Sequence, residues 1–161
     1  MRDLITTLGA MPDQLDRLFR SFPEGFARWT PPSWDGIPGE AYPAVGQICH
    51  VRDIEIDGYQ VRIRRLLDER QPKLVSLDGD SLALERRYAE ADPEEALAAF
   101  RAARRGTLEL LEGISAEQLR RDGAFEGYGP VTLEGLLHFL CSHDQQHLAC
   151  LQWLLGKFAS R

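Results

Sequence analysis

Residues 131–155, VTLEGLLHFLCSHDQQHLACLQWLL, predict one long amphipathic helix at the end of the chain. Thr132 is a good N-cap, and Val131 and Leu136 are spaced to form a hydrophobic staple across it. The apolar face then continues at helical spacing through leucines that we expect to be buried. They are Leu137, Leu140, Leu148, Leu151 and Leu155.

The same helix carries two histidines, His143 and His147, four residues apart. Because a helix turns by about 100° per residue, a four-residue step lets both imidazoles converge on one ion from a single rigid element. His138 precedes His143 by five residues and faces elsewhere, so we exclude it. The pair predicts a metal site whose third ligand comes from another part of the fold. The candidate is His50, inside another long helical stretch.

Three further segments have the apolar rhythm of helices. The first runs from about Leu4 to Phe22, with an expected break near Pro12. The second runs from about Pro43 to Glu69 and ends before Pro72. The third begins at Asp92, where a capping residue is followed by a proline and two glutamates. Together with the last segment they make four main helices.

The connections between these helices differ in character. Residues 30–43 are dense in proline and glycine and predict an irregular loop that contains Trp34. Residues 71–91 make a long crossover, in which Ser81 to Tyr88 forms a short helix or an extended segment. Residues 123–130 predict a glycine-rich loop. No segment alternates convincingly with a period of two, so we expect no sheet.

The length of 161 residues suits one domain spanning 1–161. The predicted fold class is all-α, a four-helix bundle with a long crossover between the second and third main helices. No apolar run approaches the roughly 20 residues that a membrane span needs, so we expect no membrane association. The N-terminus lacks the apolar stretch of a secretory signal, and we therefore expect a cytoplasmic location.

A net charge of −6 and a pI near 5.2 argue against nucleic-acid binding, which needs a basic face. Two basic clusters lie among carboxylates, and we interpret them as solvated helix faces. They are Arg62, Arg64 and Arg65 in the second helix, and Arg101, Arg104 and Arg105 in the third.

Other side chains near the histidines are alternative metal ligands. Cys150 shares their helix face, but lies about 10 Å from His143 along the helix, so we favour core packing. The chain has three cysteines, an odd number that suggests reduced thiols. Asp53 and Asp57 follow His50 by three and seven residues, and we favour salt bridges with neighbouring arginines for both.

Three imidazoles with open water positions make the usual arrangement for a catalytic ion, and they suit zinc, nickel, iron or copper. The spacing alone does not choose the metal. The glutamate of the H-E-x-x-H metalloprotease motif is replaced here by Asp144, so a metalloprotease interpretation lacks its base.

Two segments together resemble the DinB-like superfamily, also called DinB/YfiT-like metalloenzymes, and the resemblance spans nearly the whole chain. Gly46–Glu55, GQICHVRDIE, looks like the first-histidine helix of that family, and Val131–His147 looks like its final helix. The resemblance implies a four-helix bundle with a three-histidine site, in which His50, His143 and His147 are the metal ligands and water completes the coordination. It assigns no role to Asp144.

The superfamily includes S-transferases and isomerases that use mycothiol, bacillithiol or glutathione, some amide hydrolases, and many members without a known reaction. The resemblance therefore implies a divalent zinc, nickel or iron ion, a small-molecule substrate, a low-molecular-weight thiol for the transferase case, and a homodimer. Such an ion lowers the pKa of water or of a thiol toward neutrality. We expect a metal-dependent transferase or hydrolase. The alternative is a noncatalytic metal-binding or stress-related bundle.

The sequence also suggests where a substrate would bind. We expect the walls of the pocket to come from the Trp34 loop and from the crossover between Asp80 and Tyr88. Arg86, Arg87 and Tyr88 could hold a carboxylate, although surface ion pairing is the interpretation that we favour for them.

Overall fold

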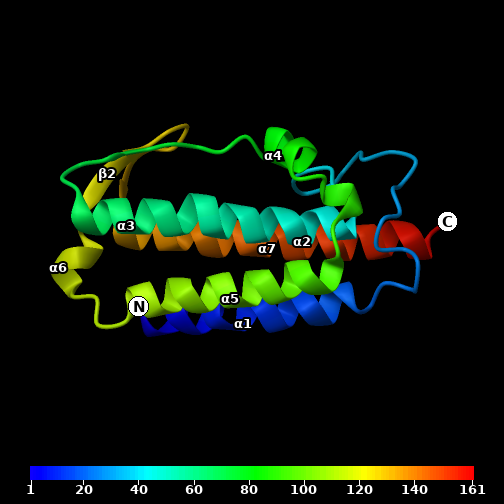
Figure 1. Ribbon diagram of the computed structural model, residues 1–161, viewed down its shortest axis with the longest axis horizontal. Coiled ribbons are helices and arrows are strands. Elements are labelled where there is room, and N and C mark those ends of the chain that lie inside the picture. Colours follow the sequence, from blue (N-terminus) through cyan, green and yellow to red (C-terminus); the bar gives the residue numbers. More distant parts are fainter.

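Four long helices pack side by side in the computed structural model, which describes all residues Met1–Arg161 (Figure 1). Helix α1 contacts α5 and α7, and α2 contacts the same two helices from the other side. The predicted four-helix bundle is therefore confirmed. The long helices are α1 (Arg2–Phe19), α2 (Ala44–Asp53) with its continuation, α5 (Pro93–Leu111) and α7 (Leu133–Ala159).

The second long helix contains an irregularity that the sequence did not predict. After α2 the chain continues through a π-helical segment, η1 (Ile54–Tyr59), into α3 (Gln60–Asp68). A π-helical turn accommodates an extra residue, and such turns are frequent at functional sites. Here η1 directs Glu55 to α5 and contributes Tyr59 to the pocket described below.

The predicted break at Pro12 is wrong, because α1 runs through it as one helix. A proline inside a helix leaves the carbonyl four residues earlier without its backbone donor. That carbonyl belongs to Leu8, and it accepts a hydrogen bond of 2.9 Å from Arg104 Nη1 on α5. The tertiary contact therefore satisfies the group that Pro12 leaves open, while Leu8, Met11 and Leu15 are buried on either side of it.

The predicted helix starts are confirmed by their caps. The Asp92 side chain accepts the backbone N–H groups of Glu94 and Glu95 at the start of α5. Thr132 accepts that of Gly135 at the start of α7. A short helix, α6 (Ala116–Leu119), begins with a complete capping box. These local interactions stabilise each helix where the sequence places its beginning.

The expectation of no sheet is wrong, and residues 123–130, predicted as a glycine-rich loop, lie in a β-hairpin. A small sheet has the order β1-β2-β3, with β1 parallel to β2 and β2 antiparallel to β3. Its strands have two to four residues, which is too short for alternation to be visible in the sequence. Gly127 and Gly129 have positive φ and allow the tight β2–β3 turn. The strands are β1 (Lys73–Leu74), β2 (Asp122–Phe125) and β3 (Gly129–Thr132).

The predicted crossover between the second and third main helices is confirmed. It runs along the outside of the bundle over the second long helix (Figure 1). It contains β1, then α4 (Gly79–Glu85), which contacts α2, and a 3₁₀ turn, η2 (Tyr88–Glu90). The sheet ties one end of this crossover to the β2–β3 hairpin. The crossover thus covers one face of α2 and α3, and it contributes Leu74 and Tyr88 to the core.

The basic clusters are only partly solvated, so that interpretation needs correction. Arg64, Arg101 and Arg105 are exposed, but Arg62 and Arg104 are buried. Arginines on one helix turn point in different directions, and only the packing of neighbouring helices decides which of them is covered. None of the helices combines the length and the apolar character that a membrane span requires.

Candidate metal centre

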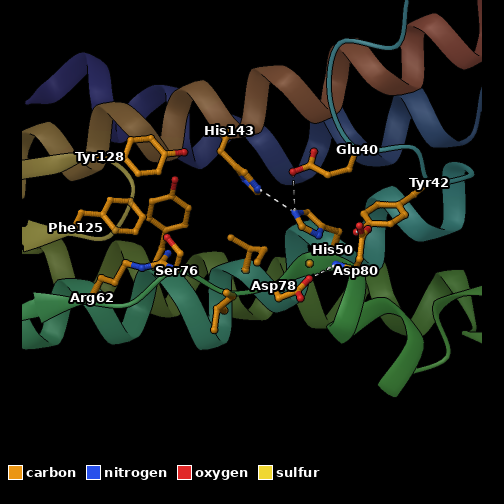
Figure 2. Close-up of a pocket in the computed structure, with 14 residues that line it drawn as sticks. Glu40, Tyr42, His50, Arg62, Ser76, Asp78, Asp80, Phe125, Tyr128 and His143 are labelled. Atoms are coloured by element: carbon orange, nitrogen blue, oxygen red, sulfur yellow. Dashed lines mark hydrogen bonds and ion pairs between the residues drawn. The ribbon is translucent and has the colours of Figure 1, made fainter. Parts of the chain in front are cut away.

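All three predicted histidines meet on one side of the bundle. His50 comes from α2, while His143 and His147 lie one turn apart on α7. His143 Nε2 lies 3.3 Å from His50 Nε2 and 3.1 Å from His147 Nε2. Figure 2 shows the His50 and His143 rings pointing toward each other across the site. His138 is exposed and takes no part, as predicted.

This spacing fits a common ion. Ligand nitrogens at 2.0–2.1 Å from a tetrahedral ion lie about 3.3 Å from one another. The ligand atoms of the three residues all lie within 4.8 Å of one another, and the Nε2 separations of 3.1 and 3.3 Å match the tetrahedral value closely. The donor set, three imidazoles, suits zinc, nickel, iron or copper.

The electrostatics of the cluster also favour a cation. Burial lowers the pKa of His50 and His147, and it lowers the pKa of His143 to about 3, with repulsion between the rings adding to the effect for His143 and His147. All three rings are therefore neutral at pH 7, which is the form that binds metals. A neutral imidazole has one nitrogen with a free lone pair, and the three Nε2 atoms lie close enough together to offer such lone pairs to one ion.

Gln47 supports the site from behind, and the sequence analysis did not identify it. Its Oε1 lies 2.6 Å from His147 Nδ1, while its Nε2 donates to the carbonyls of Glu40 and Tyr42. Because these contacts fix the amide orientation, His147 Nδ1 carries the proton and Nε2 presents its lone pair. The available signal was the spacing: Gln47 precedes His50 by three residues and so shares its helix face.

Glu40 is a second functional candidate that the sequence analysis missed. Its carboxylate oxygens lie 3.6 Å from His147 Nε2 and 3.8 Å from His50 Nε2, and its side chain is 36% exposed. Gln146 Nε2 donates to the same carboxylate at 3.3 Å. Glu40 belongs to the proline-rich loop, where no periodic pattern marks a residue that faces the bundle.

A glycine allows this loop to approach α7 closely. A Cβ atom at Gly39 would lie 2.5 Å from Gln146 Nε2 and 3.0 Å from Cys150 Sγ. Only a residue without a side chain fits this gap. Gly39 therefore lets the following residue, Glu40, reach the histidines.

Packing, and not a hydrogen bond to Nδ1, holds the His50 ring in place. Its Nδ1 is buried without a hydrogen-bond partner in the protein. The ring lies against that of Tyr42, with centroids 5.5 Å apart, and against the backbone of the crossover. A Cβ atom at Gly79 would lie only 2.7 Å from His50 Cε1, so the crossover covers this ring at the closest distance that the chain permits.

A pocket of about 330 Å³ opens beside the histidines (Figure 2). Its volume lies at the lower end of the range for small-molecule sites. One end contains Glu40 and Tyr42, the other contains Arg62 and Tyr128, and the crossover covers the space between them. The complete lining is Glu40, Tyr42, His50, Ile54, Tyr59, Arg62, Ser76, Leu77, Asp78, Gly79, Asp80, Phe125, Tyr128 and His143.

The predicted pocket walls are therefore correct only in part. The crossover does line the pocket, but through 76–80, of which only Asp80 lies in the predicted range. Trp34 does not line it and stacks instead on Trp153, with ring centroids 6.0 Å apart. Wrapping of the loop around the end of α7 carries Trp34 away from the histidines.

The side chains suggested as carboxylate binders have other partners. Arg86 pairs with Asp53 at 3.0 Å and with Asp57 at 2.7 Å. Arg87 pairs with Glu90 on the surface, as we favoured. Tyr88 is buried and donates its hydroxyl to Asp53 at 2.8 Å. None of the three lines the pocket beside the histidines.

The alternative metal ligands are also occupied elsewhere. Asp53 is held by Arg52, Arg86 and Tyr88, which confirms the salt-bridge interpretation. Cys150 is buried, and burial raises the pKa of its thiol to about 12, so it packs as a neutral group.

Asp144, beside His143 in sequence, forms a buried ion pair with Arg104 at 2.7 Å. Arg104 is 1% exposed and also makes a two-point contact with Glu55, at 2.9 and 3.0 Å. Thr107 donates its hydroxyl to Glu55 as well. We call Glu55, Arg104 and Asp144 the buried charge triad. Its members satisfy one another and leave no free group facing the pocket.

The fold and the site together define a class: a four-helix bundle whose second and last long helices bring three histidines together beside a small pocket. The family model of the DinB superfamily matches residues 7–151, so the chain belongs to the DinB superfamily. The resemblance seen in the sequence is thereby confirmed.

Among solved structures the chain is similar to YfiT from Bacillus subtilis, with a TM-score of 0.85. The two share 19% sequence identity, and the match covers 98% of this chain and 87% of that one. That protein is described as a probable metal-dependent hydrolase with an unusual four-helix bundle topology. At this identity the likeness shows the fold. No curated protein matches the chain.

Proposed function

We propose that the protein is a metal-dependent hydrolase of small molecules, in which His50, His143 and His147 hold one divalent zinc, nickel or iron ion. One observation carries the proposal: three buried, neutral imidazoles converge at 3.1 and 3.3 Å beside a pocket. An ion bound there supplies Lewis acidity, which acidifies a nucleophile and polarises a carbonyl. The family membership and the description of YfiT agree with this chemistry.

Glu40 is the group that would accept the proton of the nucleophile. Its carboxylate faces the nitrogens of His50 and His147 from the open side and borders the pocket. A general base must lie within hydrogen-bond reach of the proton it takes, directly or through one water, and this position meets that requirement. Gln146 donates to Glu40 Oε2, the oxygen that faces His147, while Oε1 faces His50.

Thiol-dependent S-transfer is the second candidate. The histidines leave one side of the site open to the pocket, where a sulfur ligand fits as well as water. No cysteine of the chain lines that pocket, so the thiol would have to be a low-molecular-weight cofactor. In this case Glu40 would accept the thiol proton. Assays with and without added thiol distinguish the two candidates.

The first test is the metal content of untagged protein, measured by elemental mass spectrometry after mild dialysis. We expect about one ion per chain in the wild type and loss of the ion in His50→Ala, His143→Ala and His147→Ala, because removing any ligand leaves an incomplete site. The matched control is His138→Ala, which removes an exposed histidine from the same helix and should keep the ion.

Activity is then screened on amides and esters with the metal found, with and without thiol. Hydrolysis that is lost in His147→Ala and strongly reduced in Glu40→Gln is the expected result. Failure of the wild type to bind zinc, nickel or iron would contradict the proposal and favour a noncatalytic bundle. Metal binding without any reaction would favour a noncatalytic metal-binding protein.

A further inference from the structure

Arg62 is a buried cation without an acidic partner. It lies on α3, is 5% exposed, and forms no ion pair. Burial lowers the pKa of its guanidinium, and no neighbouring carboxylate opposes that effect. An unpaired buried charge is costly, so such a residue calls for an explanation that its packing alone does not give.

The contacts of Arg62 with the protein use only part of its donor capacity. Nε and Nη2 donate to one acceptor, the carbonyl of Val75 in the crossover, at 3.0 and 2.9 Å. The guanidinium also lies over the rings of Phe125 and Tyr59, with Cζ 4.6 and 5.4 Å from their centroids. Nη1 has no hydrogen-bond partner. A guanidinium carries five N–H donors, so a second edge, formed by Nη1 and Nη2, is free.

Arg62 is one of the residues that line the pocket beside the histidines. Figure 2 shows Arg62, Phe125 and Tyr128 at one end of the pocket, His50 with Glu40, Tyr42 and Asp80 at the other, and His143 between the two ends. The ring of Tyr59 lies close to both His143 and Arg62: its centroid is 5.8 Å from that of His143 and 5.4 Å from Arg62 Cζ. The pocket therefore has a cationic end at Arg62 and an acidic end at Glu40, and the histidines lie at the acidic end.

We propose that Arg62 binds a carboxylate of the substrate, which makes the substrate class small carboxylic acids whose reacting group lies at the histidines. A planar carboxylate matches the free guanidinium edge with two parallel hydrogen bonds. The aromatic side chains at this end suit the apolar body of the same molecule. The position of the reacting group rests on the proposed function, whereas the carboxylate subsite does not.

The test uses two probes of the same shape, 4-fluorobenzoate and 4-fluorobenzamide, with binding measured by fluorine NMR titration of the full-length protein as purified. The wild type should bind the acid about tenfold more tightly or better, because a charged pair contributes more than a neutral one in a buried site. Equal affinity for acid and amide would overturn the proposal without any variant.

The variants then assign the preference to Arg62. In Arg62→Met the affinity for the acid should fall about tenfold or more and that for the amide should stay within about twofold. Arg62→Lys keeps the charge without the two-donor edge, so the preference should fall there as well. If Arg62→Met does not fold, Arg62→Lys alone tests whether the preference for the acid depends on Arg62. The matched control, Arg64→Met, removes an exposed arginine of the same helix and should leave both affinities unchanged.

A carboxylate could also bind a metal ion, so His147→Ala is measured in parallel. If the preference for the acid survives in His147→Ala and is lost in Arg62→Met, the carboxylate subsite at Arg62 is supported. This holds even if the wild type binds no metal. Preference that is lost in His147→Ala and kept in Arg62→Met would overturn it. Equal loss of acid and amide binding in Arg62→Met would also overturn it, because only the shape of the pocket would then depend on Arg62.

Discussion

Two buried polar clusters share α7 and the second long helix, and they differ in how completely their polar groups are paired. In the buried charge triad, Arg104 is held by two carboxylates, each through two hydrogen bonds. In the histidine cluster, three nitrogens face one another and His50 Nδ1 has no partner. His143 and Asp144 are adjacent in sequence, yet each belongs to a different cluster.

Because of this difference, one cluster stabilises the fold and the other can bind a ligand. A polar cluster whose groups are all satisfied holds helices together and has nothing left to offer a ligand. One whose donors and acceptors remain open beside a pocket has capacity for an ion or a substrate. The triad is therefore a stabilising contact between α5, α7 and η1, and the histidine cluster is the functional candidate.

The largest expected effect comes from Arg104→Met. The substitution leaves Glu55 and Asp144 buried without a counter-ion, and breaking such a pair lowers the free energy of unfolding by about 3–5 kcal/mol. It also removes the donor to the Leu8 carbonyl that Pro12 leaves open. Urea unfolding monitored by circular dichroism measures the loss.

Arg101→Met is the matched control, since Arg101 lies on the same helix and pairs with Asp13 at the surface. Its expected loss is at most about 1 kcal/mol. Replacing the whole triad, with Glu55→Leu, Arg104→Met and Asp144→Leu together, should recover much of the stability because no buried charge remains. Similar stability of Arg104→Met and Arg101→Met would show that the triad does not stabilise the fold.

The next effect is expected for Gln47→Leu. Loss of the acceptor on His147 Nδ1 frees the ring to rotate and to change tautomer, and removal of such a supporting contact typically lowers metal affinity about 10–100-fold. Zinc titration against a competing chelator measures this change.

Gln60→Leu supplies the comparison, because Gln60 is another buried glutamine, whose Nε2 donates to the Ala103 carbonyl at 2.7 Å. Both variants should lose roughly 1–3 kcal/mol of stability, since each removes the hydrogen bonds of a buried amide side chain. Only Gln47→Leu should change the affinity for zinc. Equal affinities in the two variants would remove Gln47 from the site.

The smallest effect is expected for Gly79→Ala. The added Cβ would lie 2.7 Å from His50 Cε1 and 3.2 Å from the Tyr42 hydroxyl, so either the His50 ring or the crossover must shift. Overpacking of this kind costs about 1–3 kcal/mol, and displacement of one ligand should reduce zinc affinity by about tenfold.

Gly156→Ala is its control, because outside the adjoining backbone of α7 nothing lies within 4 Å of the added Cβ. Alanine is the better helix former, so this variant should be more stable by about 0.5–1 kcal/mol and bind zinc normally. Unchanged zinc affinity in Gly79→Ala would mean that the crossover does not constrain His50.

The sequence by itself determined the four main helices, the caps of the last two, and the convergence of His143 and His147 on one helix face. Asp92 and Thr132 act within one turn of their own helices, and the four-residue spacing of His143 and His147 is a property of one helix. Such features depend on local geometry, which a period of 3.6 residues makes visible in the sequence. That these histidines hold a metal stays a prediction.

Only the tertiary structure decided the partners of the polar side chains. The two-residue strand β1 pairs with a strand about fifty residues later, and neither segment is long enough to show a pattern. Glu40 reaches the histidines because a loop folds back over α7, and Arg62 and Arg104 are buried because other elements cover them. Periodicity reports which face of a helix is apolar, whereas the surface that meets that face depends on the packing of distant segments.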